Sequence, residues 1–204
     1  PPGRLGFISG LGISANYLGQ FAGLLLALPF SKGILALFGA SARAETLLPA
    51  TLAFFLLALP MLLLFKEPDR ERIPYSIMAA FRDFLRETRR LLSASGVFLF
   101  FASYFLFNDA ILTASNNFPI FLQQVWHISD TVKTYLLLCI LITSALGGTL
   151  SGLVADRFGH KRTLLWILSG WAVLLPIVGL LTDFRVFVIA TVLMGFWFGA
   201  TWAV

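Results

Sequence analysis

The segment that decides the fold is GGTLSGLVADRFGHKR, residues 147–162. It begins with small and apolar residues and ends in a cluster of charges. Gly152 lies one turn before the charges, where the lack of a side chain lets a neighbouring helix approach closely. Asp156 lies where a carboxylate caps the N-terminus of a neighbouring helix or pairs with an arginine, and Gly159 permits a tight reversal. The segment therefore predicts a membrane-spanning helix that ends at the inner surface of a bilayer.

The composition of the whole chain also indicates a membrane protein. Of its 204 residues, 58% are hydrophobic and 12% are charged, whereas a soluble domain carries about a quarter charged residues. The apolar residues gather in blocks close to the length of about 20 residues that a helix needs to cross a bilayer. We predict an all-α polytopic membrane protein with six transmembrane helices, at residues 9–30, 47–65, 95–115, 132–152, 163–181 and 185–204.

The cationic residues predict how these helices are oriented. Through six alternating crossings, eleven of the 15 Lys and Arg residues fall on one side of the membrane. Lysine and arginine favour the cytoplasmic side, so we expect the N-terminal end and the loops at 66–94 and 153–162 to be cytoplasmic. The net charge of +5 is then a topology signal, and we expect no nucleic-acid partner.

Small residues recur every four positions in three of the blocks and predict close helix packing. The three ridges are Ala15, Gly19, Gly23 and Ala27; Ser144, Gly148 and Gly152; and Thr191, Gly195, Gly199 and Ala203.

The long loop at 66–94 contains an amphipathic pattern. Apolar residues at helical spacing alternate with arginines and acidic residues, which predicts a helix lying along the inner membrane surface. Two interpretations of its basic cluster stay open: a solvated cytoplasmic face, or a specific site for anionic lipids. The loop divides the chain into residues 1–65, the loop itself and residues 95–204.

The segment at 147–162 resembles the signature loop of the major facilitator superfamily of transporters, G-x-L-A-D-R-x-G-R-K/R-R. Val154 replaces the Leu and His160 replaces an Arg. In that family the loop is a latch that holds the cytoplasmic side closed, and the resemblance implies that the latch partners lie on helices outside this chain. The residues that match are Gly152, Ala155, Asp156, Arg157, Gly159, Lys161 and Arg162.

The resemblance also implies a register. The loop at 66–94 corresponds to the connector between two six-helix bundles, so the six blocks correspond to helices 5–10 of a twelve-helix fold. The chain starts without Met and stops inside an apolar block, and we expect an internal fragment: two helices that end the N-terminal bundle, and four that start the C-terminal bundle. The remaining transporter helices would be absent from this chain.

A narrower resemblance points to one family of these transporters. RLGFISGLGISANYLG, residues 4–19, and FASYFLFNDA, residues 101–110, resemble two stretches of the vacuole effluxers, the relatives of an autophagy-linked vacuolar amino-acid exporter. Phe107, Ala110 and Asn16 depart from that pattern. The resemblance implies a secondary active transporter for a small polar metabolite, such as an amino acid, that works by alternating access.

Polar residues within the spans are the candidates for substrate and proton binding. Asp109 is the one carboxylate well inside a predicted span, and placing an ionised Asp there costs roughly 2.5–3.5 kcal/mol unless it faces protein or water. Thr113 and Asn116 share its helix face, with Asn108 beside it, which suits a substrate amine or a coupled proton. A structural role for Asp109 stays open, as does the choice between cavity lining and packing for Asn16 and Gln20.

Enzymatic chemistry has little support in the sequence. No cluster of His, Cys and carboxylate residues has metal-ligand spacing, and no Gly-rich phosphate loop is present. We therefore expect no enzyme, no cofactor and no metal site. A non-transporting membrane receptor or scaffold and a lipid flippase remain the alternatives, and we expect the plasma membrane of a prokaryote or the vacuolar membrane of a fungus as the location.

Overall fold

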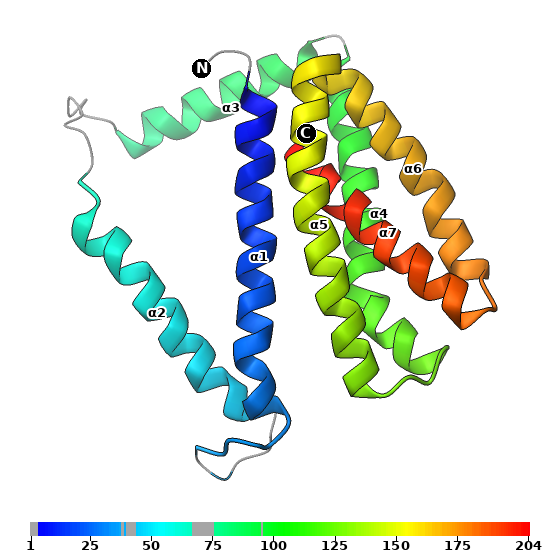
Figure 1. Cartoon of the computed structure of the whole chain (residues 1–204). Coiled ribbons are helices and arrows are strands. Elements are labelled where there is room, and N and C mark those ends of the chain that lie inside the picture. The colour runs from blue at the N-terminus through cyan, green and yellow to red at the C-terminus, as the bar shows by residue number, and fades with distance from the viewer. Residues whose placement is uncertain (1–3, 38, 40–43, 67–75, 95) are drawn as a thin grey trace. The chain divides into compact units, whose positions relative to one another are not determined.

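The computed structural model describes a chain built of α-helices and one short 3-10 helix, with no strand among the described residues (Figure 1). The described residues are 4–37, 39, 44–66, 76–94 and 96–204. The helices are α1 (Leu5–Ser31), η1 (Ala44–Thr46), α2 (Leu47–Leu64), α3 (Ile77–Ser93), α4 (Val97–Gln124), α5 (Asp130–Phe158), α6 (His160–Leu180) and α7 (Phe184–Ala203).

The prediction of an all-α protein with six transmembrane helices is confirmed. Within the described part of the chain, six helices are long and apolar enough to cross a membrane: α1, η1 with α2, α4, α5, α6 and α7. Within the predicted loop at 66–94 the structure has a helix, α3, and the part of that loop at 67–75 lies outside the described residues.

Several helices extend beyond their apolar blocks. α4 continues to Gln124 and α5 to Phe158, although hydropathy predicts ends at residues 115 and 152. The backbone hydrogen bonds of a helix do not depend on side-chain polarity, so a helix passes from the hydrocarbon into the headgroup region until a cap or a glycine stops it. Gly159 ends α5 in this way, with a φ of +91° that side-chain-bearing residues rarely adopt.

The chain forms two compact units, residues 1–63 with 128–204 and residues 64–127, and each is described by itself. In the first unit α5 packs against α1, α6 and α7, and α7 also contacts α1 and α6. The second unit contains α3 and α4, which contact each other where they join.

Small residues bring α5 and α7 together, as the ridge in the last predicted span indicates. Thr191, Gly195 and Gly199 are all buried, and the hydroxyl of Ser144 donates to the carbonyl oxygen of Gly195 at 2.8 Å. A Cβ atom on Gly199 would collide with the carbonyl oxygen of Ser144. The glycine ridge therefore sets the distance between these two helices.

Replacing Gly199 with alanine should weaken the packing of α5 on α7. We expect Gly199→Ala to lower the free energy of unfolding by about 1–3 kcal/mol, since the backbones must move apart. The measurement is unfolding of the chain in detergent micelles by titration with sodium dodecyl sulfate, followed by circular dichroism.

Gly179→Ala is the matched control, because nothing lies within 4 Å of a Cβ atom at that position in α6. It should leave stability unchanged or raise it by up to about 1 kcal/mol through helix propensity. Equal losses in the two variants would contradict the packing account.

Candidate functional site

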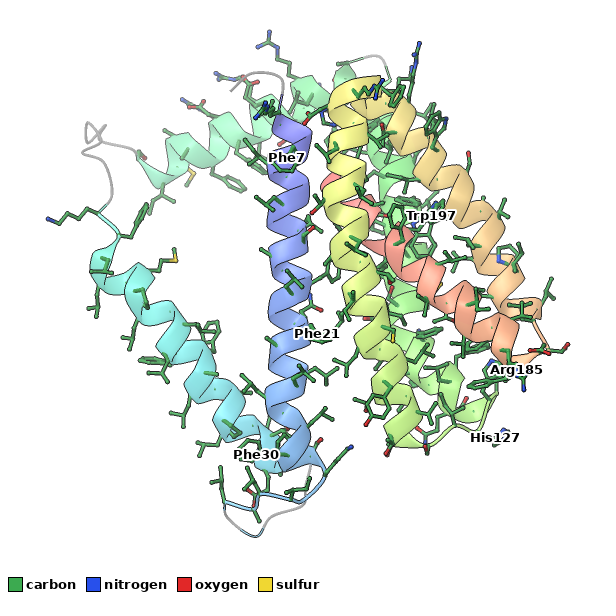
Figure 2. The ribbon with its side chains drawn as sticks, viewed as in Figure 1. Phe7, Phe21, Phe30, His127, Arg185 and Trp197 are labelled. Atoms are coloured by element: carbon green, nitrogen blue, oxygen red, sulfur yellow. The ribbon has the colours of Figure 1, made fainter. Side chains whose placement is uncertain are left out.

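The carboxylate of Asp156, in the last turn of α5, caps the first turn of α1. Its Oδ1 accepts a hydrogen bond from the backbone N–H of Gly6, and its Oδ2 accepts one from that of Phe7, both at 2.8 Å. Figure 2 shows Phe7 at this end of α1, near the end of α5 that continues into α6. The first N–H groups of a helix have no partner within the helix, and the helix dipole favours a negative charge beside them. The carboxylate of Asp156 supplies both the hydrogen-bond acceptors and the negative charge.

Among the described residues, no side chain of α1 itself or of its N-cap residue caps the start of this helix. The residue at the N-cap position is Arg4, and it makes no side-chain capping hydrogen bond. Its positive charge is also the unfavourable sign at the N-terminal end of a helix dipole. The start of α1 therefore depends on a group that another helix brings to it.

Glycines on both helices allow this close approach. A Cβ atom on Gly6 would lie 2.6 Å from the carbonyl oxygen of Gly152 and 2.9 Å from Oδ1 of Asp156. A Cβ atom on Gly10 would collide with the carbonyl oxygen of Gly148. Larger side chains would separate the helices and move the carboxylate away from the backbone that it caps.

Ser14 forms the polar end of the same interface. Its buried Oγ lies 2.8 Å from the carbonyl oxygen of Gly10, at hydrogen-bond distance from that of Ala145, and 2.7 Å from Oγ1 of Thr149. A hydroxyl has one hydrogen, so Ser14 donates to one carbonyl at a time and is free to accept from Thr149. The α1–α5 interface thus runs from the cap at Gly6 to this hydroxyl pair.

The predicted small-residue ridge of α1 is wrong in register. The sequence indicates Ala15, Gly19, Gly23 and Ala27, but a Cβ atom on either glycine would meet nothing within 4 Å among the described residues. The residues buried on α1 are Gly6, Gly10, Ser14 and Tyr17. The same four-residue spacing runs from Gly6 through Gly10 to Ser14, so a ridge could have been found there.

The ridge on α5 is buried as predicted, but it serves two neighbours. Ser144 contacts α7, whereas Gly148 and Gly152 contact α1. The sequence resemblance implies latch partners on helices outside this chain, whereas the structure gives Asp156 two hydrogen-bond donors on α1, within it.

The residues that follow Asp156 in the signature segment lie at the surface, whereas Ala155 before it is buried. Gly159 connects α5 to α6, and its carbonyl oxygen accepts from the backbone N–H and the hydroxyl of Thr163. The guanidinium of Arg157 lies 5.5 Å from the centre of the Phe158 ring, and no ion pair holds it within the described part of the chain. Lys161 and Arg162 are exposed in the first turn of α6.

The polar residues predicted to line a cavity fall in two different units. Asp109, Thr113 and Asn116 are exposed on α4, and Asn108 beside them is half-buried. Within the described residues, no hydrogen bond or ion pair joins Asp109 to another side chain.

Asn16 and Gln20 lie exposed on α1, where the amide of Gln20 donates to the oxygen of Asn16 at 2.7 Å. Tyr17 between them is buried and packs edge-on against Phe198 of α7, with ring centroids 6.1 Å apart. Among the described residues, no group of three or more His, Cys, Asp or Glu side chains could hold a metal ion.

The cap leads to a direct test of Asp156. We expect Asp156→Asn to increase hydrogen exchange of the backbone amides at Gly6 and Phe7 about fivefold, because the charge and one acceptor oxygen are lost. Hydrogen–deuterium exchange read by mass spectrometry of the N-terminal peptide measures it.

Asp183→Asn serves as the control. Asp183 caps its own helix, α7, by accepting from the backbone N–H groups of Arg185 and Val186, and Asn is an equally good N-cap. It should leave exchange at α1 unchanged. Unaltered exchange in Asp156→Asn would contradict the cap.

Comparison with known proteins places the chain in a family. Residues 6–202 match the family model described as vacuole effluxer Atg22 like, so the match extends from the first turn of α1 into the last turn of α7. No curated protein and no solved structure matches the chain. The match agrees with the resemblance in residues 4–19 and 101–110 and is consistent with the major facilitator superfamily. The chain belongs to the vacuole effluxer Atg22-like family, and it is a multi-pass membrane protein of a transporter family.

Proposed function

We propose that this chain forms part of a secondary active transporter that moves a small polar metabolite by alternating access. Amino acids are the substrate class to test first. The observation that carries the proposal is the capping of α1 by Asp156 of α5 across a glycine-lined interface. Membership of an effluxer family supports the transporter role.

In the proposed register, α1 and α5 belong to different bundles. Residues 1–65 end the first bundle and residues 95–204 start the second, so α1 and α5 stand as helices five and eight of twelve. The bonds from Gly6 and Phe7 to Asp156 then join the two bundles. Rocking of one bundle against the other breaks these bonds and opens a path between the helices.

The strength of the cap suits a reversible latch. An N-cap of this kind contributes about 0.5–2 kcal/mol, and water replaces its hydrogen bonds when it opens. A contribution of about 1.4 kcal/mol changes the ratio of two conformations tenfold. Such a contact biases the closed state without trapping the transporter in it.

The latch closes the cytoplasmic side in this proposal. The contact of Gly6 with Asp156 supports a topology in which the start of α1 and the end of α5 lie on the same side of the membrane. Lys161 and Arg162 follow directly in the sequence, and clustered cations favour the cytoplasmic face. We propose the vacuolar membrane as the location in a fungal cell and the plasma membrane in a prokaryotic one.

The polar stripe on α4 is the proposed site of substrate and proton binding. Asp109, Thr113 and Asn116 are exposed on one helix face in the middle of a span, where polar groups are costly unless they face protein or water. Asp109 would bind a substrate amine or a coupled proton, and Asn108, Asn16 and Gln20 remain candidates for further polar contacts.

Cross-linking α1 to α5 tests alternating access. Oγ of Ser14 and Oγ1 of Thr149 lie 2.7 Å apart, so Ser14→Cys with Thr149→Cys, in a Cys139→Ser background, should form a disulfide under mild oxidation. We expect the disulfide to abolish efflux of a radiolabelled amino-acid mixture from proteoliposomes that contain the transporter, and a reductant to restore it.

Each single-cysteine variant is the control and should be insensitive to the oxidant. Full efflux by the cross-linked protein would contradict alternating access through this interface. Substrate binding without any flux in the uncross-linked protein would favour the receptor alternative, and movement of labelled lipid would favour the flippase.

Substitution of Asp109 tests the coupling proposal. Asp109→Asn should abolish accumulation of the labelled amino acids driven by an imposed pH gradient, because an amide cannot bind and release a proton as a carboxylate does. Asp130→Asn makes the same change at an exposed carboxylate in the first turn of α5 and should leave accumulation intact. Accumulation at the wild-type rate in Asp109→Asn would remove Asp109 from the coupling role.

A further inference from the structure

Helix α3 has an apolar face that nothing in its own unit covers. At 100° per residue its apolar side chains fall within a little under half of the helix circumference. They are strongly exposed: Ile77 is 89% accessible, Met78 75% and Phe84 64%. The other exposed large apolar side chains of α3 are Phe81, Leu85, Leu91 and Leu92. An uncovered apolar face of this size on a charged helix is typical of a helix that lies in a membrane interface.

The chain itself holds α3 at the membrane surface. α3 ends at Ser93 and the membrane span α4 begins at Val97, only four positions later. At the junction, the N–H of Val97 donates to the carbonyl oxygen of Ala94 at 3.2 Å. Three intervening residues reach at most about 14 Å, so the end of α3 cannot leave the neighbourhood of the headgroup layer. A bilayer is therefore within reach of the apolar face.

The arginines of α3 are distributed unevenly around the helix. Arg86 pairs with Asp83 at 3.7 Å and Arg90 pairs with Glu87 at 3.9 Å. Arg82 and Arg89 have no ion pair among the described residues. These two residues are seven positions apart and so lie on one side of the helix, adjacent to Met78 and Leu85 at the edge of the apolar face.

This arrangement matches the chemistry of an anionic phospholipid. Once the apolar face enters the acyl-chain boundary, the edge of the helix lies at the level of the lipid phosphates. Arginine reaches this level with its aliphatic stem along the apolar surface and its guanidinium in water, and guanidinium binds phosphate in a two-point geometry. The helix as a whole carries four arginines against two acidic residues, so its charge is complementary to an anionic leaflet.

We propose that α3 is a binding site for anionic phospholipid, with the apolar face inserted in the leaflet and Arg82 and Arg89 holding the lipid phosphates. The proposal depends on the membrane-spanning nature of the chain and not on the transport function. A finding that the whole protein does not transport would therefore not contradict the lipid-binding proposal.

Hydrogen–deuterium exchange of the intact chain in lipid nanodiscs tests the site. We expect the amides of residues 77–93 to exchange more slowly in nanodiscs of phosphatidylcholine with phosphatidylglycerol than in phosphatidylcholine alone. Arg82→Gln with Arg89→Gln should reduce that difference by roughly fivefold per arginine. Raising the salt concentration should reduce it as well, because exposed charges are screened.

The matched control is Arg86→Gln with Arg90→Gln, which removes the same charge from the arginines that already have acidic partners. This variant should reduce the exchange difference between the two kinds of nanodisc by clearly less than Arg82→Gln with Arg89→Gln does. Exchange in α5 and α7 reports whether each variant remains folded and should not change between the two kinds of nanodisc.

Three outcomes would overturn the proposal. Equal exchange of residues 77–93 in both kinds of nanodisc would show a solvated face. If the two double variants reduced the exchange difference equally, the helix would be attracted to the anionic leaflet by its net charge alone, without a site at Arg82 and Arg89. Protection by inorganic phosphate in phosphatidylcholine nanodiscs would show an anion site that needs no lipid.

Discussion

The backbone N–H groups at the start of α1 need an acceptor, and the rest of the interface follows from how they obtain one. The first N–H groups of a helix have no partner within the helix, so each needs an acceptor from a side chain or from water. Asp156 satisfies two of them from another helix. A carboxylate is short, so α5 must approach α1 almost to backbone contact, and Gly6, Gly10 and Gly152 make that approach possible.

α5 is the helix on which the first unit is organised, because small residues lie on two of its faces. Ser144 and Gly147 face α7, where a Cβ atom on Gly147 would collide with the carbonyl oxygen of Phe196. Gly148 and Gly152 face α1. Lipid tails give no hydrophobic advantage to helix association, so close packing and hydrogen bonds between helices must provide it. One helix thereby fixes the positions of two neighbours.

The spans and the helix-ending role of Gly159 could be predicted from the sequence, because the length of an apolar block and the conformational freedom of a glycine depend only on nearby residues. The partner of Asp156 and the packing register of α1 could not. Both depend on which helix lies beside α5, and a ridge from Ala15 to Ala27 has the same spacing as one starting at Gly6. For Asp109, the sequence identifies an unusual carboxylate within a span, while the groups that would surround it in the proposed transporter depend on how the helix bundles assemble.

The helix starts of this chain differ in where their caps come from. α5 and α7 carry their own, with the hydroxyl of Ser129 accepting from Val132 and the carboxylate of Asp183 accepting from Arg185 and Val186. The first turns of these two helices are capped without an acceptor from another helix. α1 has Arg4 in that position, so the order of its first turn reports whether α5 is in place. A capping side chain at position 4 would cap α1 locally, and the order of its first turn would then no longer depend on α5.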